Sequence, residues 1–162
     1  MTPDAEIWSI AIAAALGVIL TWVAYSDFRA RRIPNASILA ILGLFVFWTI
    51  VHHFTGLGGT LLCAALVLLI TFGLSIAKIF GAGDAKLLTV LALFMGPNHL
   101  LGFLAVTALA GGGLAIMALA VNPWRMRSTG SPSSLVARGV PYGVAIAIGG
   151  AVTMVTSLLN VI

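Results

Sequence analysis

The sequence contains very little charge and a single cysteine. Of its 162 residues, 7% are charged and only four carry a carboxylate side chain. One cysteine, Cys63, excludes a disulfide within the chain and any zinc site of the CxxC type. The eight basic residues are scattered, and the net charge is only +4, so no nucleic-acid-binding surface is indicated. These shortages exclude a disulfide scaffold, a zinc ribbon and a nucleic-acid-binding protein.

Apolar residues fill the sequence instead. They make up 61% of the chain, with a mean hydropathy of +1.18, which is more apolar surface than a soluble domain of this size could cover. A spanning helix needs ~20 mostly apolar residues, and lipid requires every backbone polar group to be satisfied internally. We therefore expect an all-α, polytopic membrane helix bundle that forms a single domain over residues 1–162. About six transmembrane helices are expected, over residues 7–25, 37–54, 59–80, 84–95, 100–121 and 141–162.

The basic residues fall in alternate loops of this arrangement. They follow the first expected helix, flank the junction of the third and fourth, and lie between the fifth and sixth: Arg29, Arg31, Arg32, Lys78, Lys86, Arg125, Arg127 and Arg138. Positive charge marks the cytoplasmic side of membrane proteins, so both termini are expected outside the cytoplasm. Asp27 and Asp84 then share the cytoplasmic face, and the histidines His52, His53 and His99 fall on the opposite face.

Asp27 and Asp84 each lie at the edge of an apolar run. An ionisable group at membrane depth costs ~3 kcal/mol, and its default interpretation is functional. The expected helix 84–95 is short, since ~12 residues reach only about 18 Å. Either this helix begins earlier, through Gly81 and Gly83, or Asp84 lies in a water-filled recess below the membrane surface.

Two carboxylates at close range can do acid–base chemistry. They cannot both ionise easily, so the pair holds one proton between them. The ionised member can take a proton from water while the protonated member donates to a scissile carbonyl oxygen, without a metal or cofactor. Alternatives remain open: Asp27 could be neutralised by nearby arginines, and Asp84 could cap a helix. A small ion or proton transporter using both aspartates, or a non-catalytic assembly factor, would also fit a polytopic protein.

Three segments carry a resemblance to a known family. Residues 81–86 contain Gly-x-Gly-Asp-x-Lys, residues 27–35 place an Asp before a basic stretch and Ile-Pro-Asn, and residues 141–143 are Pro-Tyr-Gly. Together they resemble the type IV prepilin peptidases, a family of GxGD intramembrane aspartic proteases, and the similarity spans nearly the whole chain. The resemblance implies a catalytic pair, Asp27 and Asp84, and no cofactor or metal. It implies further residues that shape the active site: Gly81, Gly83, Lys86, Pro34, Asn35, Pro141, Tyr142 and Gly143.

The resemblance also implies the substrate and the cellular location. Substrates of the family are prepilins and pseudopilins, whose leader is cleaved at the cytoplasmic face of the bacterial inner membrane. The expected partners are therefore this leader with its transmembrane helix, together with membrane lipids, and not nucleic acid. Larger members carry a cytoplasmic insert, usually with paired CxxC motifs, that is associated with N-methylation. This chain has no such insert and resembles the short, peptidase-only enzymes of Flp (tight adherence) pilus systems. Its oligomeric state is left open.

Overall fold

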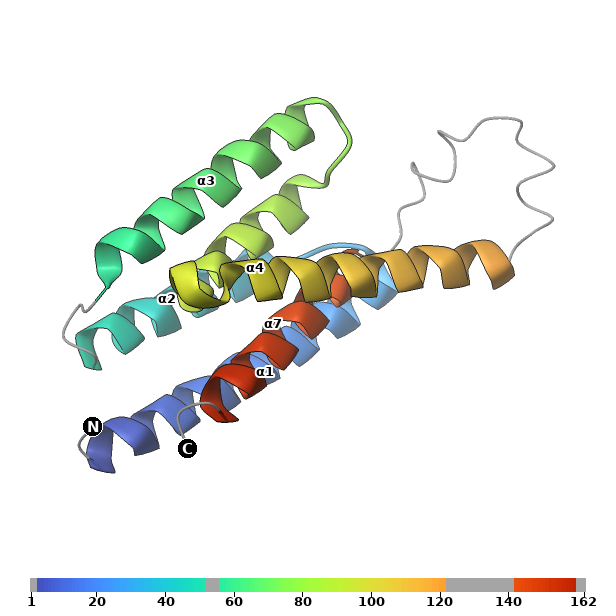
Figure 1. Ribbon diagram of the computed structural model, residues 1–162. Coiled ribbons are helices and arrows are strands. Elements are labelled where there is room, and N and C mark those ends of the chain that lie inside the picture. The colour runs from blue at the N-terminus through green and yellow to red at the C-terminus, as the bar shows by residue number, and fades with distance from the viewer. Residues whose placement is uncertain (1–2, 52–55, 122–141, 160–162) are drawn as a thin grey trace.

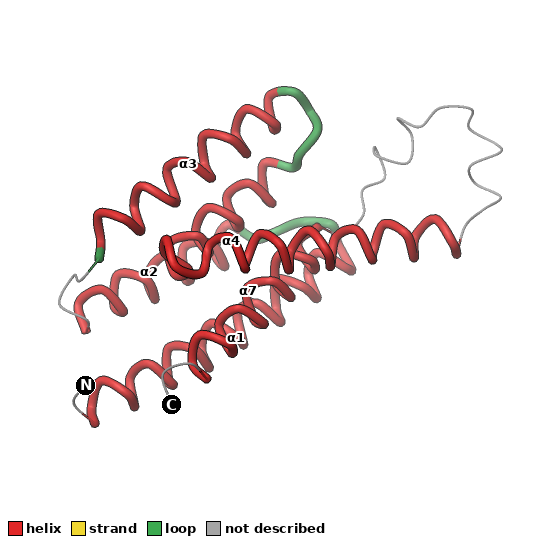
Figure 2. The backbone as a smooth tube through the Cα atoms, viewed as in Figure 1, coloured by secondary structure: helices red, strands yellow, loops and turns green. Residues whose placement is uncertain are grey.

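All regular secondary structure in the described part of the chain is helical. The computed structural model describes residues 3–51, 56–121 and 142–159, and no strand occurs in these ranges. The prediction of an all-α fold is therefore confirmed, as Figure 2 shows. The predicted polar loop at 122–139, with its arginines, lies outside the described residues, as do His52, His53 and Pro141. The helices are α1 (Pro3–Ala30), α2 (Asn35–Val51), α3 (Leu57–Ile76), α4 (Ala82–Val121) and α7 (Tyr142–Leu159).

The first helix is longer than expected. It continues to Ala30, so the prediction that Asp27 follows the helix is wrong, and Asp27 lies in its last turns. The expected end at residue 25 lies where hydropathy falls. Polar residues can nevertheless continue a helix beyond the apolar layer, and here they do so for five more residues. The helix ends where Arg31 takes a left-handed conformation with φ of 50°, while its N–H donates to the Asp27 carbonyl at 2.9 Å.

The fourth and fifth expected helices form one kinked element, α4. The prediction of a turn between them is confirmed, although the turn is confined to Gly96, whose backbone leaves helical geometry with φ 55° and ψ −174°. Pro97 starts the second half at once, since proline lacks an N–H and fits the first turn of a helix. At its other end α4 begins at Ala82, so the helix starts within the glycine motif, the first of the two alternatives considered. Asp84 thus lies in its first turn.

The helices pack as a bundle in which the second half of α4 crosses its neighbours. Figure 1 shows α1 and α7 running side by side, with the second half of α4 passing across them. Helix α4 packs against α7, α3 and α2, and α1 packs against α7 and α2. The largest fully buried side chains come from α1, α2, α4 and α7: Leu16, Val23, Ile41, Leu87, Leu91, Phe103 and Ile146.

Within residues 3–51, 56–121 and 142–159, three segments are long and apolar enough to cross a membrane. They are Ile7–Ala30, Leu57–Ile76 and Ala82–Ala118, whereas Asn35–Val51 and Tyr142–Ser157 are shorter apolar helices. Many large apolar side chains face outward, Leu101 among them with 79% of its surface exposed, as expected where lipid is the solvent. The fold is therefore that of a membrane protein, and the number of six spans stays a prediction.

Candidate active site

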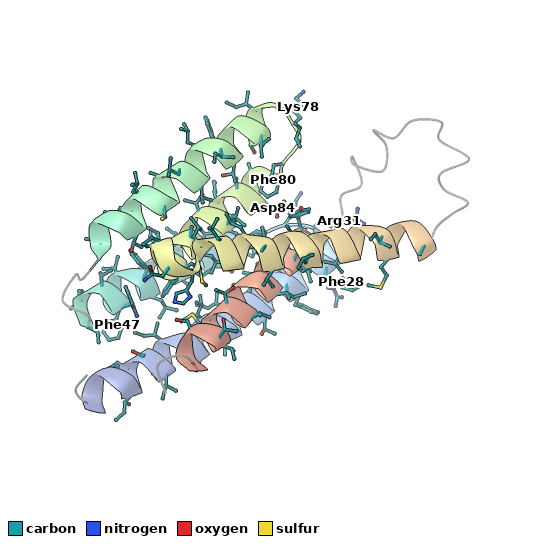
Figure 3. The ribbon with its side chains drawn as sticks, in the orientation of Figure 1. Phe28, Arg31, Phe47, Lys78, Phe80 and Asp84 are labelled. Carbon is teal, nitrogen blue, oxygen red and sulfur yellow. The ribbon has the colours of Figure 1, made fainter. Side chains whose placement is uncertain are left out.

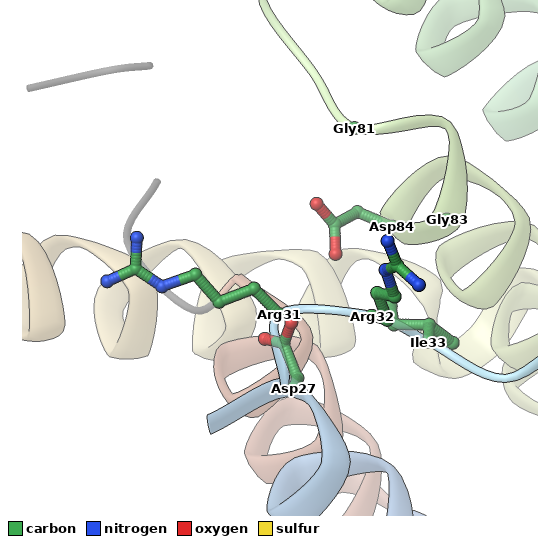
Figure 4. A pocket seen from close by; sticks show the side chains of 7 residues that line it. All are labelled: Asp27, Arg31, Arg32, Ile33, Gly81, Gly83 and Asp84. Atoms are coloured by element: carbon green, nitrogen blue, oxygen red, sulfur yellow. The ribbon is translucent and has the colours of Figure 1, made fainter. Parts of the chain in front are cut away.

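Asp27 and Asp84 line the same pocket. The pocket has a volume of about 340 Å³, and α1, the segment that follows it, and the start of α4 contribute its walls. Figure 4 shows the carboxylates of Asp27 and Asp84 on different elements of this pocket, with the Arg31 side chain extending away from Asp84. The lining residues are Asp27, Arg31, Arg32, Ile33, Gly81, Gly83 and Asp84. The fold therefore brings together two carboxylates that lie far apart in the sequence.

Asp27 is buried between α1 and the start of α7. Only 6% of its surface is exposed, and its carboxylate accepts hydrogen bonds from the backbone N–H groups of Gly143 and Val144. The positive charge of Arg31 also acts on it. Its Oδ2 nevertheless has no hydrogen-bond partner among the described residues. Since leaving a buried polar atom unpaired costs about 1–3 kcal/mol, this oxygen is held in a state that stability alone does not favour.

Gly143 can approach Asp27 because it has no side chain. A Cβ on Gly143 would lie 2.8 Å from Oδ2 of Asp27 and 2.9 Å from its Cγ. Both distances are closer than non-bonded atoms normally come. A larger residue at this position would therefore move the carboxylate, or separate α7 from α1.

Asp84 is half-buried in the first turn of α4, and its own loop limits its position. A Cβ on Gly81 would lie 2.6 Å from Oδ2 of Asp84, and the Gly81 carbonyl accepts the Ala85 N–H at 3.0 Å. Gly83 packs against Ile33, with a distance of 3.5 Å from a built Cβ. The charge of Asp27 acts on Asp84. Gly81 thus lets the backbone pass close to the Asp84 carboxylate, whereas Gly83 makes an ordinary packing contact with the opposite wall of the pocket.

The other residues singled out from the sequence lie around the pocket without lining it. Lys86 is exposed on α4. Pro34 and Asn35 are at the start of α2, where the Pro34 carbonyl accepts the Ser37 N–H at 3.1 Å. Tyr142 contacts the Phe80 ring, one residue before the glycine motif.

Sequence reasoning missed three lining residues, Arg31, Arg32 and Ile33. The two arginines were interpreted as markers of membrane topology, although they fall inside the motif that begins at Asp27. Ser26 helps to hold this segment, since its hydroxyl donates to the Arg32 carbonyl at 2.9 Å. The signal that could have identified them is their position within a few residues of a carboxylate at a helix end.

The site combines acids and bases at one end of the bundle. Figure 3 shows Arg31, Lys78, Phe80 and Asp84 toward this end, whereas Phe47 lies at the other. Across residues 3–51, 56–121 and 142–159, no three His, Cys, Asp or Glu side chains gather as metal ligands would. Two carboxylates that face one pocket are suited to general acid–base chemistry on a group bound between them.

Comparison with known proteins identifies the family of the chain. The model of the type IV leader peptidase family matches residues 14–116, which is more than half of the sequence and includes both aspartates. Among curated proteins no relative matches, and among solved structures none matches. On the strength of the family match, and with the paired carboxylates inside it, the chain belongs to the type IV leader peptidase family.

Proposed function

We propose that the protein is a membrane aspartic endopeptidase that removes the leader peptide of prepilins and pseudopilins, with water activated by Asp27 and Asp84. Membership of a leader peptidase family supports the hydrolytic activity. The observation that carries the assignment of the residues is that both carboxylates line one pocket. Gly81 and Gly143 support the same role, since each permits a close approach to one of the two carboxylates.

The chemistry follows from a pair that shares one proton. The ionised carboxylate removes a proton from water, and the resulting hydroxide attacks the carbonyl carbon of the scissile bond. The protonated carboxylate donates its proton to the carbonyl oxygen, giving a neutral tetrahedral intermediate. As this intermediate collapses, the C–N bond breaks, the amine nitrogen takes up the proton of the protonated carboxylate, and a hydroxyl of the intermediate returns its proton to the other carboxylate. The products are a new carboxyl end on the leader and a new amine end on the pilin.

The substrate approaches from the side of the membrane where the pocket opens. Arg31, Arg32, Lys78 and Lys86 occur in the same segments as the two aspartates, and positive residues favour the cytoplasmic side. We propose six spans in the bacterial inner membrane, both termini outside the cytoplasm, and a scissile bond at the cytoplasmic interface. The leader with its transmembrane helix and the surrounding lipids are the proposed partners.

The domain organisation is part of the proposal. Residues 1–162 are proposed to form one peptidase domain without a methyltransferase insert, as in peptidases of Flp pilus systems. The transporter alternative gains no support, because it requires ionisable groups along several helices. Helices α2, α3 and α7 carry no Asp, Glu, Lys or Arg.

The decisive experiment is cleavage of a prepilin by the purified protein in detergent. Wild-type protein is expected to release the leader, and Asp27→Asn and Asp84→Asn are each expected to slow this about 10²–10⁴-fold, the usual contribution of an acid–base group. Thr89→Ala is the matched control, because Thr89 lies on α4 near Asp84 but bonds only the Ala85 carbonyl among its described contacts. A wild-type protein that leaves the prepilin intact, or an aspartate variant as fast as the control, would refute the proposal.

A further inference from the structure

An aromatic contact joins the two glycine segments that pack against the carboxylates. The rings of Phe80 and Tyr142 meet edge to face, with centroids 5.4 Å apart and planes at 75°. Phe80 directly precedes Gly81, and Tyr142 directly precedes Gly143. Each ring is therefore one residue away from the glycine that limits the position of one carboxylate.

Both sides of this contact are anchored in other elements. The Phe80 carbonyl accepts a hydrogen bond from the Ser75 hydroxyl at 3.0 Å, and its N–H donates to the Leu74 carbonyl at 3.3 Å. The Tyr142 ring lies against Gly111 in the second half of α4, where a built Cβ would stand 3.1 Å from Cζ. The end of α3 thus fixes the backbone of Phe80, and α4 confines the Tyr142 ring.

We propose that the Phe80–Tyr142 ring pair is a positioning element that sets the separation of Asp27 and Asp84 for reaction; the inference rests on the proposed peptidase function. A shift of Tyr142 moves the N–H groups that hold Asp27, and a shift of Phe80 moves the backbone beside Asp84. Neither ring is among the residues that line the pocket, so both act through the carboxylates. Misplacing a reacting group by about 1 Å can cost about 100-fold in rate.

A second aromatic pair provides a matched control. Phe45 and Phe94 also meet edge to face, with centroids 5.6 Å apart and planes at 74°. This pair joins α2 to α4, and neither ring lines the pocket. Phe94 is half-buried, as are Phe80 and Tyr142, but neither Phe45 nor Phe94 adjoins a glycine that packs against a carboxylate. Truncation of Phe94 therefore removes the same kind of contact away from these glycines.

The test measures kcat and KM for prepilin cleavage in detergent. Phe80→Ala and Tyr142→Ala are each expected to lower kcat about 10- to 100-fold with KM almost unchanged, since the loss is confined to the transition state. The double variant is expected to be no slower than the worse single variant, because both substitutions remove one shared contact. Tyr142→Phe keeps the ring and is expected to keep the wild-type kcat, as is Phe94→Ala.

The outcomes separate this inference from the proposed function. If the wild-type protein cleaves and Tyr142→Ala cleaves with the same kcat, or if the two single losses multiply in the double variant, the positioning role is refuted. If the wild-type protein never cleaves, the proposed function itself fails. Should Tyr142→Ala not fold, Gly111→Ala displaces the ring without removing it, and a wild-type kcat for that folded variant would refute the inference equally.

Discussion

Asp27 and Asp84 face one pocket, but the chain holds them in different ways. Asp27 is buried at the end of α1 and packed against Gly143 at the start of another helix. Asp84 is half-buried, and its closest restriction comes from Gly81, three residues earlier in the same segment. The position of one carboxylate depends on packing between distant parts of the chain, and that of the other on a local turn. Changes near Asp27 should therefore affect both stability and activity, whereas changes near Asp84 should affect mainly activity.

The largest difference in thermal stability is expected between alanine substitutions at Gly143, beside Asp27, and at Gly81, beside Asp84. Gly143→Ala places a methyl group between α7 and Asp27, so we expect it to destabilise the protein by about 1–3 kcal/mol, as overpacking does, and to lower turnover about 100-fold. Gly81→Ala meets only the end of the Asp84 side chain, which can rotate away. It should lower turnover while changing stability by less than about 0.5 kcal/mol. Thermal unfolding in detergent and prepilin cleavage measure the two effects.

A third glycine gives the control for that measurement. Gly17 lies inside α1 with no atom near a built Cβ, so Gly17→Ala should keep activity and gain up to about 1 kcal/mol from helix propensity. Equal losses of thermal stability in Gly143→Ala and Gly81→Ala would contradict the contrast between the two carboxylates.

A smaller difference in thermal stability is expected between Asp27→Asn and Asp84→Asn, in which each carboxylate becomes an amide. Asp27→Asn keeps an oxygen to accept the N–H groups of Gly143 and Val144 but removes a buried charge, which is costly in an apolar surrounding. We expect a gain of about 1 kcal/mol, which is about 2–4 °C in the thermal midpoint for a chain of this length. Asp84→Asn should change the midpoint much less, since Asp84 is half-exposed. A lower midpoint for Asp27→Asn than for Asp84→Asn would show that burial is not what distinguishes them.

The smallest difference in stability is expected between Arg31 and Lys78, which among the described residues are the non-glycine positions with left-handed backbone. Glycine at either position relieves about 1–2 kcal/mol of backbone strain and costs about 0.5–1 kcal/mol of chain entropy. Lys78→Gly should therefore gain about 0.5 kcal/mol and keep its activity. Arg31→Gly gains the same backbone term but removes a charge that acts on Asp27, so kcat/KM should fall by up to about tenfold, equivalent to ~1.4 kcal/mol. Equal kcat/KM values for Arg31→Gly and Lys78→Gly would show that the Arg31 charge does not contribute to catalysis.

Much of the fold could be predicted from the sequence because lipid limits the choices. Long apolar runs can only be helices, and the helical cores of α2, α3 and α7 fall where hydropathy places them. The ends were less predictable. Hydropathy reports where the apolar layer stops, while α1 stops only at Arg31, where the backbone becomes left-handed. The turn predicted at Gly96-Pro97 is present, but it is confined to a single bent position with helix on both sides.

For the site, the sequence indicated the two carboxylates and several neighbouring glycines, but not the contacts that these residues make. Asp27 and Asp84 are conspicuous because carboxylates are so scarce. The packing of Gly143 against Asp27 and the contact between Phe80 and Tyr142 depend on how α7 lies against α1 and α4, which no local pattern encodes. Arg32 lines the pocket because the segment after α1 folds back under a hydrogen bond from Ser26, a geometry that charge counting cannot supply.

The bend at Gly96 divides α4 into two helical arms and acts as a pivot between them, at a position outside the pocket that holds Asp27 and Asp84. One arm carries Asp84 in its first turn, and the other carries Gly111, which confines Tyr142. Fifteen residues of helix between pivot and Gly111 span about 22 Å, so a rotation of about 3° at the pivot displaces Gly111 by roughly 1 Å. Under the proposed positioning role of Tyr142, the torsion angles of Gly96 would therefore influence the alignment of two carboxylates that lie outside its own contacts.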